Sequence, residues 1–204
     1  MSKEFIEKAI GIFACAIDGY HTADCVDTPL RNPYPAGSIE NILYRKNWID
    51  TVQWHLEDII RNPEIDPSEA LAIKRRIDRS NQDRTDLVEE IDAYFRGLYA
   101  DVKALPDATI NTESPAWAID RLSILELKIY HMREQAERPD AAPDHRARCA
   151  AKLAVLEEQR ADLSQAIATL LADIAAGRKY MKVYLQMKMY NDPATNPVLY
   201  GKKR

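Results

Sequence analysis

Residues 143–177, PDHRARCAAKLAVLEEQRADLSQAIATLLADIAAG, decide the fold class. Apolar side chains return every seven residues along this stretch, which is the period of a long α-helix packed against other helices. Proline suits the first position of a helix, and Gly177 suits the position just after the last one. We therefore expect a helix from about Pro143 to Ala176. The apolar repeat consists of Cys149, Leu153, Leu156, Leu163, Ile167, Leu170 and Ile174.

Four further segments show the same helical pattern and are separated by short links with proline or other turn residues. Ser38, Asp66 and Ser114 stand where helix N-caps are expected, and proline follows the last two of them. Long helices joined by short links usually pack antiparallel. We therefore expect an all-α protein, an antiparallel bundle of about five main helices with a short C-terminal tail. The four further helices are expected at residues 3–20, 39–61, 67–105 and 115–139.

The whole chain, residues 1–204, is expected to form a single helical domain, since its length suits one domain. Residues 21–37 are expected to form a proline-rich loop. Pro29, Pro33 and Pro35 lie in this stretch, and each of them blocks the continuation of a helix. The loop therefore separates the first two helices.

The C-terminal tail, residues 178–204, is basic and rich in tyrosine. Apolar and polar side chains alternate from Tyr180 to Tyr190, which is the period of a strand. A lone strand would need a partner from a second chain, because a helical bundle offers none. We therefore prefer a short helix here and keep a homo-oligomer formed through the tail as an alternative. The sequence NDPATNP predicts turns further on.

Composition limits the classes of partner and the compartment. The net charge of −4 gives no general attraction to nucleic acid or to anionic membranes, so both are disfavoured as partners. The chain has no signal-peptide pattern at its start and no apolar run near the roughly 18 residues that a membrane-spanning helix needs. We expect a cytoplasmic protein in which Cys15, Cys25 and Cys149 are reduced thiols.

Polar side chains interrupt the apolar stripes of three predicted helices. Burying such groups is costly unless each finds a partner or a ligand. The favoured interpretation is a buried network of salt bridges and amides, with Asp86, Asp120 and Glu157 as partners. The other is a polar pocket whose arginines bind an anion such as a phosphate. The interrupting residues are Ser80, Asn81, Arg84, Arg121, Lys128, His131 and Arg160.

His55 and Asp58 are three residues apart on the predicted second helix, so both side chains can point the same way. Metal ligation or acid–base chemistry would suit such a pair, and a divalent metal ion is the cofactor that it suggests. A helical histidine beside acids is more often a surface or hydrogen-bonding residue, and this interpretation is favoured. No set of metal ligands is assigned from the sequence.

Glu89 and Asp92 form an ExxD pair on the predicted third helix, a pattern found in the magnesium sites of MazG-type pyrophosphohydrolases. Such a site needs a second acid cluster on the preceding helix. In an antiparallel hairpin, Glu57 would lie about 27 Å from Glu89 at 1.5 Å of rise per residue. The two acid groups are therefore not expected to meet, and a solvated helix face is the favoured interpretation of the pair.

Five segments, in order, carry a family resemblance: WIDTVQWHLEDIIRNPEIDP, IKRRIDRSNQDRTDLVEEID, SPAWAIDRLSILELKIYHM, VLEEQRADL and KVYLQMKMYNDPATNPVLY. Together they resemble a bacterial family catalogued as domain of unknown function 4254, over about residues 13–200. The resemblance implies a bacterial, cytosolic, helical protein and brings no established activity, cofactor or catalytic residue. One departure is Ser-Pro-Ala-Trp at 114–117, where the family is expected to have Thr-Pro-Gly.

The resemblance overlaps the interrupted stripes, and this raises the pocket hypothesis. We expect a protein that binds, and could turn over, an anionic phosphate-bearing metabolite in a polar pocket within the bundle. The alternative is a non-catalytic helical interaction protein that partners an enzyme or itself through its tail. The predicted catalytic candidates are His55, Asp58 and His131, and the predicted ligand-binding residues are Asn81, Gln82, Arg84, Asp120, Arg121 and Arg160.

Overall fold

The computed structural model describes residues 2–187, 189 and 192–201. It confirms the all-α bundle, which is built from five long helices. Among the described residues, none of these helices is both long and apolar enough to cross a membrane. The elements are α1 (Ser2–His21), α2 (Ile39–Ile60), α3 (Pro67–Leu98), β1 (Thr109–Ile110), α4 (Pro115–Glu137), α5 (Pro143–Ala175), β2 (Lys179–Tyr180) and α6 (Pro197–Tyr200).

The helices begin at the predicted caps. The Ser38 hydroxyl accepts a hydrogen bond from the backbone N–H of Asn41 at 3.1 Å. The Asp66 carboxylate accepts from two backbone N–H groups of the first turn of α3. Ser114 caps α4 in the same manner. Local side-chain chemistry therefore sets where these three helices start.

Helix α3 ends at Leu98, so the predicted end near Leu105 is wrong. The chain beyond Leu98 makes contacts with the end of α5 instead of continuing the helix. The N–H of Leu105 donates to the carbonyl oxygen of Gly177 at 2.9 Å, and the N–H of Thr109 donates to that of Arg178 at 3.1 Å. These hydrogen bonds join residues far apart in the sequence. The repeat of apolar residues along one helix cannot predict such contacts.

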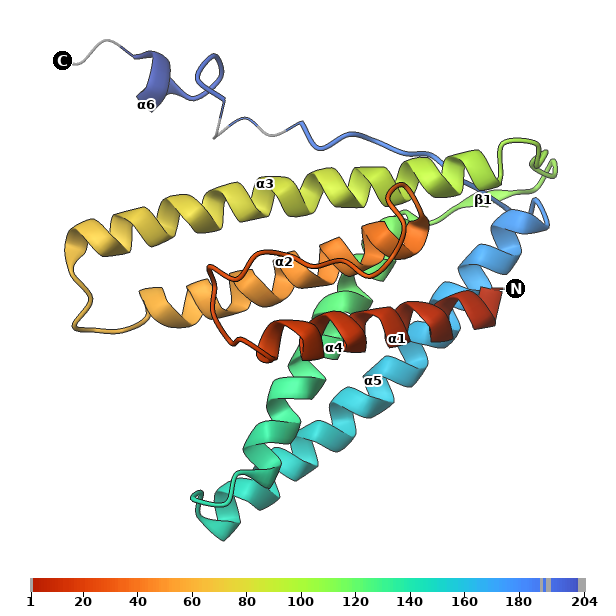
Figure 1. Cartoon of the computed structure of the whole chain (residues 1–204). Helices are drawn as coiled ribbons and strands as arrows, with labels where there is room; N and C mark the ends of the chain where they lie inside the picture. Colours follow the sequence, from red (N-terminus) through yellow and green to blue (C-terminus); the bar gives the residue numbers. More distant parts are fainter. Residues whose placement is uncertain (1, 188, 190–191, 202–204) are drawn as a thin grey trace.

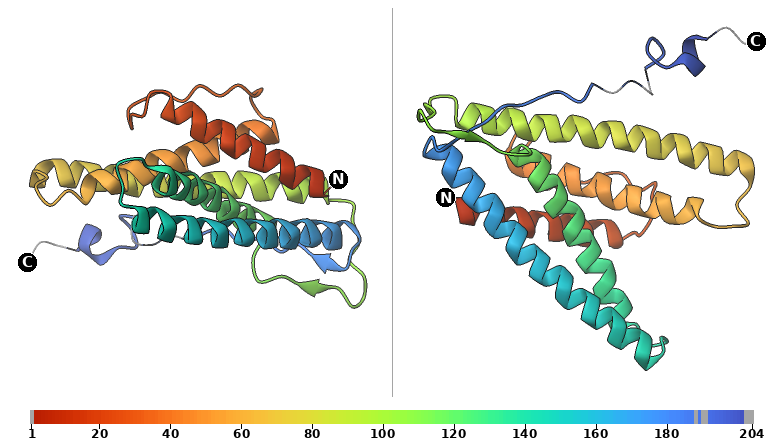
Figure 2. Two further views of the ribbon diagram at one scale, coloured as in Figure 1. Left: turned by 90° about the horizontal axis from the view of Figure 1, so that it is seen from below. Right: turned by 180° about the vertical axis from the view of Figure 1, so that it is seen from behind.

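The helices form two groups that pack across one core, as Figures 1 and 2 show. Helices α2 and α3 run antiparallel, and α4 and α5 form a second antiparallel hairpin that crosses the first group at an angle. Helix α1 is the exception to the antiparallel rule. The loop of residues 22–38 carries the chain back along the bundle, so α1 and α2 run in the same direction. Their C-terminal ends therefore lie side by side.

The main apolar core joins α1 to all four other long helices. Its largest members are almost completely removed from water, and burying a side chain of this size stabilises the fold by about 1.5–3 kcal/mol. A smaller apolar cluster between α2 and α3 contains Leu56, Ile73 and Ile77. The largest fully buried residues of the main core include Phe13, Tyr20, Phe95, Ile119 and Leu122.

Lys46, Asp50 and Asp120 are buried together where α2, α3 and α4 meet, and the half-buried Arg84 joins them. Lys46, with 0% of its surface exposed, pairs with Asp50 and, at 2.9 Å, with Asp120. The guanidinium of Arg84 donates two hydrogen bonds to Asp120, each 2.9 Å long. The Ser123 hydroxyl donates to Asp50 at 2.6 Å. The charges balance and both carboxylates have several partners, which is the condition under which buried ions are tolerated.

The two carboxylates of this network respond differently to burial. Burial raises the pKa of Asp50, although the charge of Lys46 opposes it. Burial acts in the same direction on Asp120, but the hydrogen bonds from Arg84 and the charge of Lys46 outweigh it, so the pKa of Asp120 is lowered. Asp120 therefore contributes stability that is present at neutral pH and is lost as the pH falls through its folded-state pKa.

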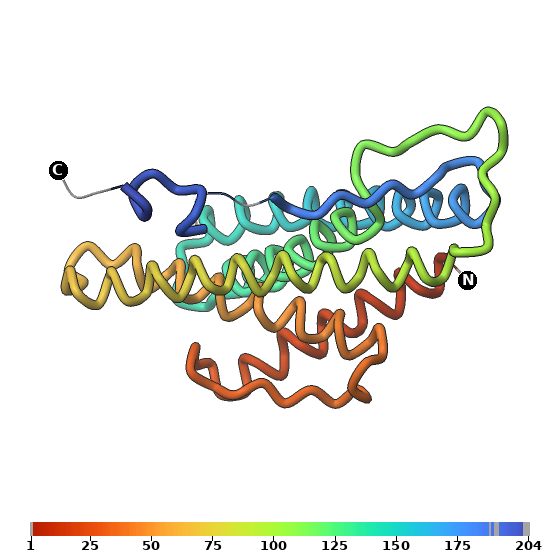
Figure 3. Tube along the Cα trace, turned by 90° about the horizontal axis from the view of Figure 1, so that it is seen from above, coloured from red at the N-terminus to blue at the C-terminus, as the bar shows by residue number. Residues whose placement is uncertain are grey.

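The tail differs from the predicted short helix, and that prediction is wrong for the described residues. Lys179–Tyr180 form strand β2, which pairs in parallel with β1 of the same chain, so no second chain is needed. Residues 181–187 have no regular structure and run beside α3 (Figure 3), where the N–H of Gln186 donates to Glu89 at 3.1 Å. Lys188, Tyr190 and Asn191 lie outside the described residues.

We predict that Asp120→Asn lowers the free energy of unfolding by about 3–5 kcal/mol, because the cations Lys46 and Arg84 then share the single carboxylate of Asp50. The measurement is urea denaturation at pH 7. Glu113→Gln is the control, since its partner Arg121 has 67% of its side chain exposed and such pairs contribute about 1 kcal/mol or less. Equal effects of the two substitutions would show that the buried network does not hold the helices together.

Candidate metal centre

Three histidines from three helices meet at one end of the bundle. His21 is the last residue of α1, His55 lies near the C-terminal end of α2, and His131 lies near that of α4. One ring nitrogen of each lies within 4.8 Å of the corresponding nitrogens of the other two. The Nε2 atoms of His55 and His21 are 3.2 Å apart. All three residues are half-buried, so the cluster lies at the edge of the core.

Each imidazole of this cluster lies flat against one aromatic ring. Such stacking fixes the plane of the imidazole and shields one of its faces from water. Aromatic rings from three helices thus enclose the cluster. The stacked pairs are His55 with Tyr20 (ring centroids 5.0 Å apart), His21 with Tyr130 (4.5 Å) and His131 with Trp54 (4.9 Å).

An oxygen atom faces the Nδ1 atom of each histidine. Carbonyl and carboxylate oxygens only accept hydrogen bonds, so the neutral rings of His21 and His131 carry their proton on Nδ1. Their Nε2 atoms then hold lone pairs, of which that of His21 faces the Nε2 atom of His55 at 3.2 Å. The facing oxygens are the carbonyl of Ile17 for His21 (2.8 Å), Glu134 for His131 (2.7 Å) and Asp58 for His55 (3.7 Å).

The Nε2 atom of His131 is buried and has no hydrogen-bond partner among the described residues. A buried acceptor without a partner costs about 1–3 kcal/mol, so such atoms call for an explanation. A metal ion at the centre of the cluster would satisfy this lone pair together with that of His21. His55 would contribute the third nitrogen. Outer oxygens that orient ligating histidines are a regular feature of metal sites in proteins.

The distances suit a tetrahedral ion. Two nitrogens that each lie about 2.0–2.1 Å from a tetrahedral zinc ion are roughly 3.3 Å from one another. The Nε2 atoms of His21 and His55 are 3.2 Å apart, which matches this edge. The third nitrogen lies within 4.8 Å of both, so it would move closer to them when an ion binds.

The pKa of His55 is lowered, first by burial and then by the neighbouring His131 and His21. The charges of Asp24 and Asp58 act in the opposite direction without reversing the shift. His55 is therefore neutral at pH 7. Neutral imidazole is the form that binds metal ions.

The predicted arginines do not share one pocket. Arg84 is engaged with Asp120, Arg121 is exposed and pairs with Glu113, and Arg160 lies 3.6 Å from Glu126. Each of the three guanidinium groups already faces a carboxylate. The arrangement therefore gives no geometric support to a single phosphate site built from all three.

The other predicted ligand-binding residues make hydrogen bonds to protein side chains. Asn81 accepts a hydrogen bond from Gln53 at 3.0 Å. Gln82 donates to Asp86 on the next turn of α3 at 2.7 Å. Glu157, named as a partner for the interior arginines, pairs instead with Arg133 at 3.2 Å.

A pocket of about 440 Å³ adjoins the histidine cluster. Two of its lining residues also contact the cluster, since Trp54 stacks on His131 and Asp58 faces His55. Its size falls within the range of small-molecule sites. The remaining lining residues are Asp50, Gln53, Glu57, Arg61, Arg84, Ile124 and Leu127.

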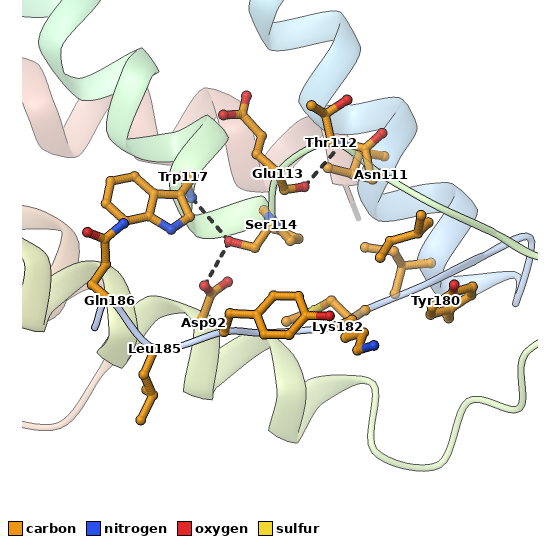
Figure 4. A pocket seen from close by; sticks show the side chains of 16 residues that line it. Asp92, Asn111, Thr112, Glu113, Ser114, Trp117, Tyr180, Lys182, Leu185 and Gln186 are labelled. Carbon is orange, nitrogen blue, oxygen red and sulfur yellow. Dashed lines mark hydrogen bonds between the residues drawn. The ribbon is translucent and has the colours of Figure 1, made fainter. Parts of the chain in front are cut away.

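A second pocket, of about 410 Å³, lies between the tail and the start of α4 (Figure 4). At its base the hydroxyl of Ser114 donates to the buried carboxylate of Asp92 at 2.7 Å. Asp92 thus supports the N-terminus of α4, while Glu89 holds the tail through Gln186. The two acids of the ExxD pair therefore have separate contacts.

Residues 40–183, more than two thirds of the chain, match the family described as "Protein of unknown function (DUF4254)". The chain belongs to this family. Within the DUF4254 match lie His55 and His131, whereas His21 precedes it. No curated protein and no solved structure matches the chain significantly. The family description carries no activity, so the function has to be argued from the site itself.

His21 is not among the residues predicted from the sequence. Its signal is weak, because His21 stands alone at the boundary between the first helix and the proline-rich loop. His55 and His131 were found as candidates, but nothing in the sequence showed that their helices meet. The parallel packing of α1 and α2 completes the cluster, and it depends on the course of residues 22–38.

We predict that His55 makes the metal-free protein less stable in mild acid. Its folded-state pKa lies below the ordinary value of 6.5, so the unfolded chain takes up the proton more readily. The free energy of unfolding therefore falls as the pH drops through about 6.5. In urea titrations at pH 7.5 and 5.5, His55→Gln should lose less stability than the wild type. An identical loss in both proteins would contradict a buried, neutral His55.

Proposed function

We propose that this protein binds a zinc-type divalent transition-metal ion through His21, His55 and His131. One observation carries the proposal: three ring nitrogens converge within 4.8 Å, and the nitrogen left free on His131 is buried without a partner. Imidazole suits zinc, copper, iron and nickel among the common metals. Zinc is the first choice, because three histidines are a known zinc ligand set.

The proposed centre has an open coordination position. Structural zinc sites have four protein ligands, whereas catalytic sites have three and keep the fourth position for water or substrate. Among the described residues, the group of possible ligands contains three members. The half-buried position of the cluster at the edge of the core supports access for a small molecule. We therefore propose metal-assisted hydrolysis as the class of reaction.

A phosphate-bearing metabolite remains part of this proposal as one class of ligand. A metal ion with an open position polarises a phosphoryl or carbonyl oxygen. The metal ion would then supply the positive charge that the sequence analysis assigned to the arginines. Arg84, beside the pocket of about 440 Å³, keeps 25% of its side chain exposed.

We predict that the wild-type protein binds one Zn²⁺ ion per chain. His21→Gln, His55→Gln and His131→Gln should each weaken zinc binding by about 100-fold or more. Loss of a residue that only hydrogen-bonds a metal ligand weakens binding by roughly 10–100-fold, and loss of a ligand itself should cost more. The measurement is competition with a chromophoric zinc chelator. Circular dichroism of each metal-free variant checks that it folds.

His145→Gln is the matched control, because His145 is the only other histidine of the chain and contacts Cys149 on α5 instead of the cluster. It should bind zinc like the wild type. Zinc binding that is unchanged in all three cluster variants, or equally weakened in the control, would refute the proposed centre.

A second proposal concerns the tail, which supports the alternative of an interaction protein. Residues 193–195 form turns, and α6 follows behind the cap Asn196. Several apolar side chains of this region face solvent, including Met187 with 85% and Val198 with 87% of their surface exposed. Exposed apolar side chains at the end of an extended segment favour a contact with another protein.

We predict that the chain forms a homo-oligomer through its tail and that removing the residues after Met187 abolishes this self-association. Light scattering of the full chain should give the mass of a dimer, and the shortened chain should give that of a monomer. The same mass for both chains would rule out self-association through the tail. The zinc affinity of the shortened chain should be unchanged, because the truncation leaves the three histidines in place.

A further inference from the structure

A small pocket of about 240 Å³ lies where the end of α3 meets the beginning of the tail, and we refer to it as the basic pocket. Among the described residues, the charged residues that line it are Arg96 and Lys179, so its wall carries two positive charges and no negative one. Tyr99 and Tyr180 also line it, and a phenol hydroxyl can donate a hydrogen bond to an anion. The lining therefore suits an anionic group.

Backbone contacts hold the walls of the basic pocket in place. One wall comes from residues 99–104, after α3, and the other from residues 179–181, after α5. The N–H of Leu105 donates to the carbonyl oxygen of Gly177 at 2.9 Å and so ties the two segments together. Gly177 has a φ of 71°, and a Cβ atom there would lie 2.5 Å from the carbonyl oxygen of Lys103. Glycine permits this close approach, and the pocket is formed by the fold itself.

Neither cation of the basic pocket has a carboxylate partner within the part of the chain that the structure describes. The ion pair next to it in the sequence, Arg178 with Asp173, does not include Lys179. Arg96 and Lys179 thus differ from the three predicted arginines, each of which faces a carboxylate. Their charges are not neutralised by the protein.

The helix ends do not engage these cations either. Lysine and arginine side chains near a helix C-terminus often bind the last carbonyl groups. Here the backbone itself supplies donors, since the N–H of Tyr99 donates to Phe95 in α3 and the N–H of Arg178 donates to Asp173 in α5. The two cations are therefore available to a ligand.

The basic pocket adjoins the larger pocket of about 410 Å³ between the tail and the start of α4. Ile174, Tyr180 and Met181 line both of them. Figure 4 shows Trp117 of α4 and Lys182 of the tail among the side chains around the larger pocket. A ligand can therefore contact both pockets at once.

The acids that line the larger pocket are already engaged. Asp92 accepts the hydrogen bond from the capping hydroxyl of α4, and Glu113 pairs with Arg121 at 3.0 Å. The ammonium group of Lys182 lies over the ring of Tyr184, 5.3 Å from its centroid. Aromatic and aliphatic side chains make up much of the remaining wall, as in many small-molecule sites.

We propose that the two pockets together bind a small phosphate monoester that carries a planar ring. The phosphate lies in the basic pocket between the guanidinium of Arg96 and the ammonium of Lys179, because arginine and lysine are the usual partners of phosphate oxygens. The ring lies in the larger pocket beside the indole of Trp117, where an aromatic contact is favourable. The residues that line the two pockets do not include the three clustered histidines, so this site does not depend on the metal ion.

The test is a nuclear magnetic resonance titration of the metal-free protein with phenyl phosphate, inorganic phosphate and phenol. Phenyl phosphate contains both recognised groups, so it should bind at least about tenfold more tightly than either of the other two probes. Arg96→Gln and Lys179→Gln should each weaken phenyl phosphate binding by about tenfold, because each removes a charged hydrogen-bond donor. Phenol binding should not change in these two variants.

A further variant tests the position of the ring. Trp117→Leu should weaken the binding of phenyl phosphate and leave that of inorganic phosphate unchanged. The melting temperature of each variant checks that it folds. Arg96 and Lys179 lie outside the apolar core, so their variants should melt like the wild type.

Arg75→Gln is the matched control, because Arg75 is an exposed arginine of the same helix. It lies about 31 Å from Arg96 along α3 at 1.5 Å of rise per residue. Arg75→Gln should bind phenyl phosphate like the wild type. His131→Gln should do the same, which separates this site from the proposed metal centre.

The proposed site is overturned if phenyl phosphate does not bind to the wild type, or if Arg96→Gln and Lys179→Gln bind it as Arg75→Gln does. It is also overturned if His131→Gln abolishes the binding, because the phosphate would then lie at the histidine cluster. None of these results bears on whether the three histidines bind zinc, which the chelator competition measures separately.

Discussion

The buried ion network between α2, α3 and α4 is the constraint on which the rest of the structure depends. Lys46, Asp50 and Asp120 tolerate burial because they satisfy one another together with the half-buried Arg84, and they do so in a single register of the three helices. A shift by one residue along α2 or α4 would separate the charges. The same register places His55, five residues after Asp50, against His131, eleven residues after Asp120. The structural polar network and the candidate metal centre are thus consequences of one packing arrangement.

The histidine cluster shows the opposite balance. Its neighbours hold the three imidazoles firmly, through stacked aromatic rings and through oxygens at the outer nitrogens, but leave an inward lone pair without a partner. The ion network is complete with protein atoms, whereas the buried Nε2 atom of His131 has no hydrogen-bond partner among the described residues. This contrast is the physical reason for placing function at the histidines and stability at the buried charges. It also explains why the arginines are a poor guide to a ligand, since each of them already faces a carboxylate.

The sequence predicted well what is decided locally. Helix starts at Ser38, Asp66 and Ser114 follow from cap chemistry, and the seven-residue repeat of α5 follows from its buried face. The sequence-based predictions failed where contacts between distant segments determine the structure. Examples are the end of α3 at Leu98 and the pairing of β2 with β1. Two of the three histidines of the candidate site, His55 and His131, were predicted as candidates because they are polar residues on predicted helices. Lys46 was missed because a lysine among polar neighbours suggests a surface, and its burial depends on carboxylates from another part of the chain.

The central claim is that the three histidines bind one metal ion together. X-ray absorption spectroscopy at the zinc edge, on protein loaded with one equivalent of Zn²⁺, tests it most directly. The account predicts three imidazole nitrogens at about 2.0–2.1 Å and one further light atom, and the imidazole signal should fall to two rings in His131→Gln. A zinc ion surrounded mainly by water oxygens, or a spectrum that His131→Gln leaves unchanged, would contradict it.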